Sequence, residues 1–467
     1  MSLRTHIEQA WEADVLPSLM DFVAIPAVSV HFDPEWKANG HIDAAVTLIR
    51  DWCAQRDVAG LVVEVHELPG RTPVILVEAP AANGGPADDT VLLYGHLDKQ
   101  PEMVGWREDL GPWKPVREGE RLYGRGAADD GYAAFASLLA IEAAQRAGLP
   151  HGRCIVLIEG SEESGSTDLP AYLHALKDRI GSPSLVLCLD SECLTYDRIW
   201  ITTSLRGMAA GTLRVDILRE GVHSGSASGI VPSSFRIARR LLDRIEDPDT
   251  GVLRLPELHA EVPADRRRQA AELAADIDIA GHMPWVDGAG PVSDDRTQQQ
   301  IARTWEPTLS VIGAEGMPPV ASAGNVLRPY TSLQLSVRLP PTVDPQVAVE
   351  ALERTLTADP PYGAHVTFTG TNAGPGWAAP ALAPWLDAAL TEASTEVFGQ
   401  GYRALGEGGS IPFMGMLGEL FPDAQFVITG ALGPGGNAHG PNEFLHVPTA
   451  IRITECLALL LRAHATR

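Results

Sequence analysis

One segment anchors the fold prediction: Val91-Leu92-Leu93-Tyr94-Gly95-His96-Leu97-Asp98. Its apolar first half is typical of a buried strand, and the glycine ends that strand. His96 and Asp98 then follow two residues apart, and residues at this spacing on an extended chain point to the same side. An imidazole and a carboxylate would therefore leave the strand together, as a metal ligand and the carboxylate that orients it do.

Strands and helices alternate through this part of the chain. Apolar runs predict strands at residues 91–94, 154–158 and 185–189, and helical patterns separate them at 131–147 and 169–180. The alternation predicts an α/β fold with a mostly parallel sheet and helices on both faces. Ligands of such sheets gather at the carboxyl ends of the strands.

The character of the sequence changes after Gly207. Strand and helix patterns then alternate in the order expected for a small α+β sandwich of the ferredoxin-like kind, at residues 211–218, 232–245, 333–337, 345–357 and 365–369. We therefore expect an inserted domain at residues 206–380. The metal-binding catalytic domain would be discontinuous, made of residues 1–205 and 381–467.

Composition restricts the partners and the compartment. The formal charge of −24 argues against nucleic acid and anionic membranes as partners. The five cysteines form no Cys-x-x-Cys motif and are expected to be buried thiols in a reducing compartment. We expect the N-terminal segment to be an amphipathic helix rather than a signal peptide or a membrane span. We therefore expect a cytoplasmic protein.

Acids and histidines recur just beyond apolar runs or within glycine-rich turns: His96 with Asp98, Asp129 with Asp130, Glu162 with Glu163, Asp190, and His439. Adjacent carboxylates raise each other's pKa unless a cation lies between them. Five ligand candidates are too many for one closed tetrahedral site but suit two metals that share a bridging carboxylate. One of the adjacent glutamates could bind metal while the other acts as general base, so the pattern predicts hydrolysis.

These motifs resemble those of the carnosinase-like dipeptidases. That group belongs to the co-catalytic zinc metallopeptidases, which also include aminoacylases and succinyl-diaminopimelate desuccinylases. The resemblance rests on seven segments that occur in the family's order: Tyr94–Pro101, Gly124–Asp130, Glu159–Ser166, Thr203–Gly207, His223–Gly225, Gly408–Pro412 and His439–Glu443.

The resemblance implies a role for each candidate near the metals. The chain would bind two divalent ions, zinc or else manganese or cobalt, with Asp129 as the bridge, His96 and Asp190 completing one site, and Glu163 and His439 completing the other. Glu162 would be the general base, and Asp98 would orient His96.

The inserted segment would be a lid and dimerisation domain. His223 resembles the histidine that steadies the oxyanion, often from the neighbouring subunit of a homodimer. Arg338 resembles the arginine that holds the C-terminal carboxylate of a substrate, as a bidentate guanidinium can. Asn325 and Ser410 would form hydrogen bonds with the substrate.

We therefore predict a two-metal hydrolase that cleaves the amide bond of dipeptides or short peptides through a metal-bound water activated by Glu162. An N-acyl amino acid deacylase with the same site is the alternative. A catalytically inactive scaffold is disfavoured, because the base and all five ligand candidates are present. The sequence departs from the family at Glu407, where an arginine is usual, and this bears on the substrate rather than on the reaction.

Overall fold

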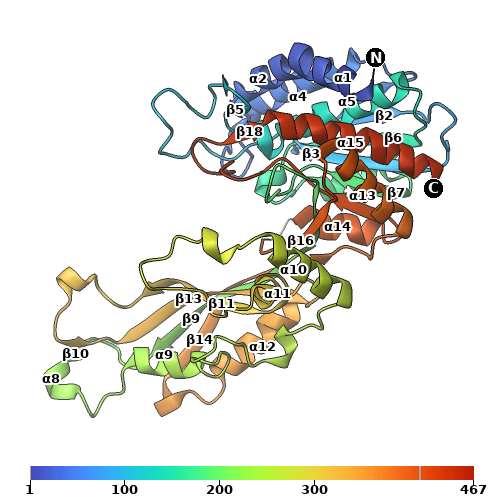
Figure 1. Cartoon of the computed structure of the whole chain (residues 1–467). Helices are drawn as coiled ribbons and strands as arrows, with labels where there is room; N and C mark the ends of the chain where they lie inside the picture. The colour runs from blue at the N-terminus through green and yellow to red at the C-terminus, as the bar shows by residue number, and fades with distance from the viewer. Residues whose placement is uncertain (1, 410–411) are drawn as a thin grey trace. The chain divides into compact units, whose positions relative to one another are not determined.

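The chain forms two compact units. The computed structural model describes residues 2–409 and 412–467 (Figure 1). Unit 1 comprises Met1–Thr202, Ala379–Ala404 and Met416–Arg467, and unit 2 comprises Thr203–Ala378 and Leu405–Gly415.

Unit 1 alternates strands with helices. Its strands are β1 (Val62–His66), β2 (Val74–Ala79), β3 (Thr90–His96), β4 (Val116–Glu118), β5 (Arg121–Tyr123), β6 (Arg153–Glu159), β7 (Pro183–Cys188), β17 (Gln425–Ile428) and β18 (Phe444–His446). Its helices and helical turns are α1 (Leu3–Ala10), η1 (Trp11–Val15), α2 (Leu16–Val23), α3 (Trp36–Asn39), α4 (His41–Ala54), η2 (Ala127–Gly131), α5 (Tyr132–Arg146), η3 (Glu162–Ser164), α6 (Leu169–Ala175), α7 (Lys177–Ile180), α13 (Pro384–Phe398) and α15 (Val447–Thr466). Three further elements span the unit boundaries: β8 (Trp200–Leu205), β16 (Arg403–Glu407) and α14 (Pro412–Leu420).

The central sheet of unit 1 has a parallel core. Its strands follow the order β1-β2-β6-β3-β7-β17, and the neighbouring pairs among β6, β3, β7 and β17 are parallel. In the register of β3, His96 lies beside Glu159 of β6, and Tyr94 lies beside Cys188 of β7. The carboxyl ends of three parallel strands therefore meet at one edge. The predicted mixed α/β fold with a mostly parallel sheet is confirmed.

Both faces of this sheet are buried. Val91 and Leu93 of β3 belong to a core cluster that includes residues of α1, α2, α4, α5, α13 and α15. The intervening residues Leu92 and Tyr94, which point to the opposite face, are buried as well. Burial on both faces explains why the strands read as continuous apolar runs rather than as alternating patterns.

Unit 2 is built on an antiparallel sheet with the strand order β11-β13-β9-β14. Figure 1 shows α9 and α12 along one side of this sheet, and their apolar residues share a core cluster with Leu213 and Val337. The elements of unit 2 are β9 (Gly207–Asp216), β10 (Val222–His223), α8 (Ser224–Ala227), α9 (Ser234–Leu242), η4 (Pro256–Leu258), α10 (Ala264–Asp276), η5 (Ala280–His282), α11 (Arg296–Trp305), β11 (Thr308–Glu315), η6 (Val320–Ser322), β12 (Val326–Leu327), β13 (Tyr330–Leu339), α12 (Pro345–Thr357), η7 (Pro361–Gly363), β14 (His365–Gly374) and β15 (Trp377–Ala378).

All five cysteines are buried and free, as predicted. Burial raises the pKa of Cys53 and Cys154 to about 12, so both are thiols rather than thiolates at neutral pH. None of the described helices is long and apolar enough to cross a membrane. The cytoplasmic location stays a prediction.

A buried lysine ties the N-terminal helices to the end of β3. Lys99 is fully buried, and its Nζ donates hydrogen bonds to the carbonyl oxygens of Phe22 at 2.7 Å and Ile25 at 2.8 Å. Its backbone N–H donates to Ala27, and its carbonyl oxygen accepts from Ser29. These bonds hold the segment after α2 alongside Asp98, the residue that precedes the lysine.

Lys99→Met is expected to lower the free energy of unfolding by about 1 to 3 kcal/mol, because the carbonyl oxygens of Phe22 and Ile25 lose a charged donor. Urea denaturation followed by circular dichroism would measure the change. Lys37→Met is the control, since Lys37 pairs with Asp43 at an exposed position and should cost less than about 0.5 kcal/mol. Equal stability of the two variants would contradict an anchoring role for Lys99.

Candidate metal centre

The predicted ligands of unit 1 come from strand ends and from two turns. His96 ends β3, Glu163 lies in η3 just after β6, and Asp190 follows β7 by two residues. Asp129 lies in η2, and His439 lies in the segment between β17 and β18. The parallel pairing of β6, β3 and β7 explains why the first three meet.

One group of potential ligand atoms comprises His96, Asp129 and Asp190, which are all buried. The Nε2 atom of His96 lies 3.3 Å from Oδ1 of Asp129 and 3.7 Å from Oδ2 of Asp190. The three ligand atoms lie within 4.8 Å of one another. Three donors at this spacing can surround one cation.

A second group comprises Asp129, Glu163 and His439. The Nε2 atom of His439 lies 3.0 Å from Oδ2 of Asp129 and 3.3 Å from an oxygen of Glu163. Asp129 therefore presents one carboxylate oxygen to each histidine. This is the geometry of a carboxylate that can bridge two cations.

The donor atoms fit divalent metal ions. The Nε2 atom of His96 is buried and has no hydrogen-bond partner among the described residues, although it faces carboxylate oxygens of Asp129 and Asp190. A buried nitrogen without a partner is costly, and a cation would use its lone pair. Imidazole and carboxylate donors without cysteine suit zinc and also manganese or cobalt.

The pKa values of the buried acids in the site depart from their usual values. Burial and the charge of Asp129 raise the pKa of Glu163 well above its usual value. Burial also raises the pKa of Asp129, but its contacts with His439 and His96 lower it more, so the net shift is downward. Glu163 and Asp129 therefore need a positive charge between them if both are to be ionised at the same time.

Asp98 organises the site through the backbone. Its carboxylate accepts hydrogen bonds from the N–H groups of Glu162 and Glu163, both at 3.1 Å, and from the hydroxyl of Ser29 at 2.5 Å. The Nδ1 atom of His96 lies 3.0 Å from the backbone oxygen of Asp98 and 3.5 Å from its carboxylate. A proton on Nδ1 donated to either oxygen leaves Nε2 free for a metal.

Glu162 belongs to neither group but lies beside the first. Its Oε2 atom is 4.0 Å from Nε2 of His96. Burial and the charge of Asp190 raise the pKa of Glu162 well above its usual value. A partly buried carboxylate that is not needed as a ligand is available for proton transfer.

Several site residues were not predicted from the sequence. Gln100 donates from Nε2 to Glu163 at 2.6 Å, and Glu159 accepts hydrogen bonds from Tyr94 and Ser166 at the end of β6. Gln100 and Glu159 lie within the motifs Tyr94–Pro101 and Glu159–Ser166. Their polar side chains beside the ends of buried strands could have indicated a role in the site. Ser29 lies far from the motifs along the chain, and its contact with Asp98 could not be predicted from spacing.

The remaining predicted residues lie in unit 2 or outside the residues that the structure describes. His223 ends β10, which pairs with β12, and Asn325 directly precedes β12; both residues are exposed. The N–H of Ser224 donates to the carbonyl oxygen of Asn325. Arg338 lies on β13 opposite Thr308. Ser410 lies outside the described residues. The substrate contacts expected for these four residues stay predictions.

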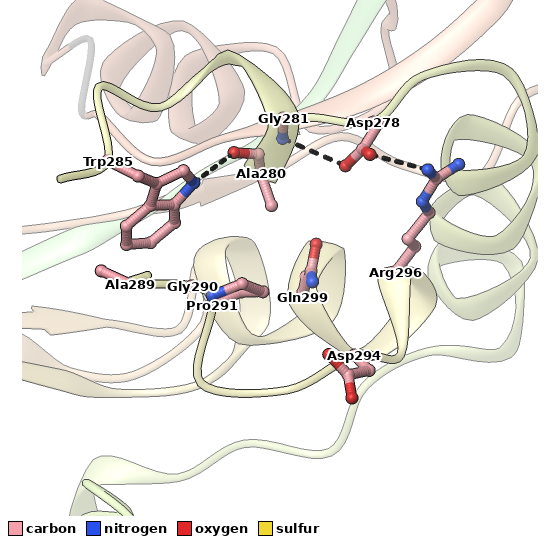
Figure 2. Close-up of a pocket in the computed structure, with 10 residues that line it drawn as sticks. All are labelled: Asp278, Ala280, Gly281, Trp285, Ala289, Gly290, Pro291, Asp294, Arg296 and Gln299. Atoms are coloured by element: carbon pink, nitrogen blue, oxygen red, sulfur yellow. Dashed lines mark hydrogen bonds and ion pairs between the residues drawn. The ribbon is translucent and has the colours of Figure 1, made fainter. Parts of the chain in front are cut away.

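Unit 2 contains a pocket. None of the predicted site residues is among the described residues that line it. Figure 2 shows Trp285 donating from Nε1 to the carbonyl oxygen of Ala280, and Arg296 paired with Asp278. The ion pair between Arg296 and Asp278 measures 2.6 Å. The cavity measures about 270 Å³. These polar groups bond one another, and we assign the pocket no function.

Replacing single ligands should lower the metal content by different amounts, because only Asp129 belongs to both groups. Asp129→Ala is expected to bind little or no zinc, while Asp190→Ala and His439→Ala should each retain about one ion per chain. Metal analysis by mass spectrometry after gel filtration would count the ions. Asp51→Ala, at an exposed acid, is the control. Full metal content in Asp129→Ala would contradict a bridging role.

The chain is similar in sequence and in fold to known proteins. Residues 92–463 match Peptidase family M20/M25/M40. The chain is 28% identical to the cysteinylglycine-S-conjugate dipeptidase of Corynebacterium striatum, over 90% of this chain and 91% of that protein. It is 27% identical to the Beta-Ala-His dipeptidase of Mus musculus, over 61% of this chain and 58% of that protein. Its fold is similar to that of human carnosine dipeptidase 1, with a TM-score of 0.73 and 21% identity, over 100% of this chain and 98% of the other. The resemblance of the motifs is thereby confirmed, and the chain belongs to Peptidase family M20/M25/M40.

Proposed function

We propose that this peptidase cleaves the amide bond of dipeptides or short peptides with two divalent metal ions. The observation that carries the proposal is the pair of ligand groups that share Asp129, with Glu162 beside them. The Corynebacterium striatum relative, which matches along most of its length, is named as a dipeptidase. That name favours dipeptides over the N-acyl amino acids of the alternative.

The metals would be held by residues of unit 1. His96 and Asp190 complete one site, and Glu163 and His439 complete the other around Asp129. Zinc suits the donor set best, with manganese and cobalt as alternatives. Such cations supply Lewis-acid polarisation of a carbonyl and lower the pKa of bound water.

Glu162 is the general base in this proposal. Its raised pKa in the metal-free site would fall as nearby cations add positive charge, which leaves a carboxylate ready to accept a proton from water. The same group can then return that proton to the leaving amine. Asp98 serves the step indirectly, because it fixes the backbone N–H groups of Glu162 and Glu163.

Unit 2 acts as the lid and dimerisation domain in this proposal. Support comes from its antiparallel sheet with α9 and α12 on one side, which is the α+β arrangement expected of an inserted domain. His223 would steady the oxyanion, Arg338 would hold the substrate carboxylate, and Asn325 and Ser410 would bind the substrate.

The dimer interface would include β11. This strand pairs with β13 on one side and has no strand on its other side among the described residues. Val311 and Ile312 are 48% and 64% exposed there, at a bulge in the register. Exposed apolar side chains on an edge strand favour association with another chain.

The proposed reaction predicts chelator-sensitive hydrolysis of dipeptides. Zinc-loaded or manganese-loaded protein should cleave members of a dipeptide panel faster than any N-acyl amino acid, and activity should disappear after chelation. Glu162→Gln should retain both metals but lower kcat at least about 100-fold, the scale of general-base loss. Liquid chromatography of the products and metal analysis of the same samples would measure both effects.

Two results would contradict the proposal in different ways. Faster turnover of N-acyl amino acids would identify a deacylase with the same metals. Near-normal kcat in Glu162→Gln would show that another group accepts the proton. Glu64→Gln, at a half-exposed acid on β1, is the control for loss of one negative charge.

The proposed interface predicts a separate effect on assembly. Ile312→Lys should weaken dimers at least about tenfold, because it places two like charges in a symmetric apolar contact. Sedimentation velocity over a concentration series would measure the dissociation constant. Thr369→Lys, at an exposed position of β14 on the opposite edge, is the matched control and should leave the dimer unchanged. A wild-type monomer at all concentrations would contradict the interface.

A further inference from the structure

His439 differs from the other candidate ligands in its local support. It lies in the stretch between β17 and β18, outside any helix or strand, and its backbone φ is +63°. Its side chain is 53% exposed, whereas that of His96 is buried. Its imidazole nevertheless lies 3.0 Å from Asp129. Some other contact must therefore hold this part of the chain in place.

A buried ion pair supplies that contact. Arg125 and Glu443 have side-chain exposures of 1% and 0%, and Nη1 of Arg125 donates to the carboxylate of Glu443. Nη2 of Arg125 donates to the carbonyl oxygens of His439 at 2.9 Å and Gly440 at 3.0 Å. One guanidinium thus holds both ends of the segment 439–443.

The same pair ties this segment to the turn that carries Asp129. The second carboxylate oxygen of Glu443 accepts from the N–H of Gly126 at 2.8 Å, and its carbonyl oxygen accepts from the N–H of Gly124 at 3.0 Å. The backbone bond between Gly124 and Glu443 continues the antiparallel pairing of β18 with β5. His439 and Asp129, two ligands of the second group, are therefore held on one frame.

The first group has other supports. His96 ends a central strand of the sheet, and Asp190 lies just beyond β7. The turn of Asp129 is also held by the hydrogen bond from Gly131 N to Gly126 O at 3.0 Å, and by the hydroxyl of Tyr132, which donates to the carbonyl oxygen of Leu189 at 2.7 Å. Loss of the ion pair would leave these contacts in place.

We infer that Arg125 and Glu443 are positioning residues for the second metal, the one held by Asp129, Glu163 and His439. The inference rests on the proposed function, since it requires that both groups bind metal. Neither side chain belongs to a ligand group; the pair acts through the backbone of His439. A guanidinium suits this task because its planar fork can serve a carboxylate and two carbonyl oxygens at once, which a lysine ammonium cannot do from the same place.

Arg125→Lys tests the inference because it keeps the charge and removes the fork. Titration with zinc in a chelator-buffered solution would measure the two affinities separately. We expect the second metal to bind about 10- to 100-fold more weakly, the usual effect of losing a group that orients a ligand, while the first affinity changes less than about threefold. Metal content should fall from two ions to one at concentrations that saturate the wild type, as in His439→Ala.

Three further variants separate positioning from stability. Glu443→Gln keeps the volume and an acceptor but removes the charge, and it should also weaken the second metal selectively. Leu457→Ala destabilises the core of unit 1 without touching the site, and both affinities should be retained. Arg117→Lys alters an exposed pair with Glu12 and should behave as the wild type.

The outcomes distinguish this inference from the proposed function. Two metals of unchanged affinity in both Arg125→Lys and Glu443→Gln would overturn the inference and leave the proposed function intact. Equal weakening of both metals, matched by Leu457→Ala, would assign the pair to general stability and would also overturn it. Fewer than two metals in the wild type would overturn the proposed function and, with it, the inference.

Discussion

The candidate site depends on the repulsion between carboxylates that the fold brings to one edge of a sheet. Parallel pairing of β6, β3 and β7 brings Glu162, Glu163 and Asp190 around His96. Burial removes most of the water that would otherwise screen these acids, and it raises the pKa of both glutamates. Divalent cations would offset this charge, so the topology of the sheet itself creates the demand for metal.

Backbone groups limit how far the site can relax without a cation. Asp98 is fully buried and holds the N–H groups of Glu162 and Glu163, and Ser29 fills a further acceptor position on its carboxylate. Ser29 is itself tied by its N–H to the carbonyl oxygen of Lys99. The acids are therefore held near one another by contacts that do not depend on metal. Because these ligands are already held in place, less free energy is lost in ordering them when a cation binds.

The sequence was most informative where structure is local. The strand around Val91 could be predicted because both of its faces are buried, and candidate ligands could be named because acids directly follow such strands. The strand β11 was missed because most of its residues are exposed and carry no alternating pattern. The pairing of Arg125 with Glu443 was missed for another reason. Contacts between residues over 300 positions apart depend on tertiary packing, which spacing along the chain does not report.

The two ligand groups differ in how strongly the fold holds them. The first is fully buried and is carried largely by the central sheet, so its donors lose little freedom when a cation binds. The second includes a half-exposed histidine on irregular backbone, and one buried ion pair ties it to the turn of Asp129. A less rigid and more hydrated group binds a cation more weakly, because ordering costs more and water competes for the ligands. In the proposed two-metal site, the sheet-borne group would therefore bind its cation more tightly than the group that includes His439.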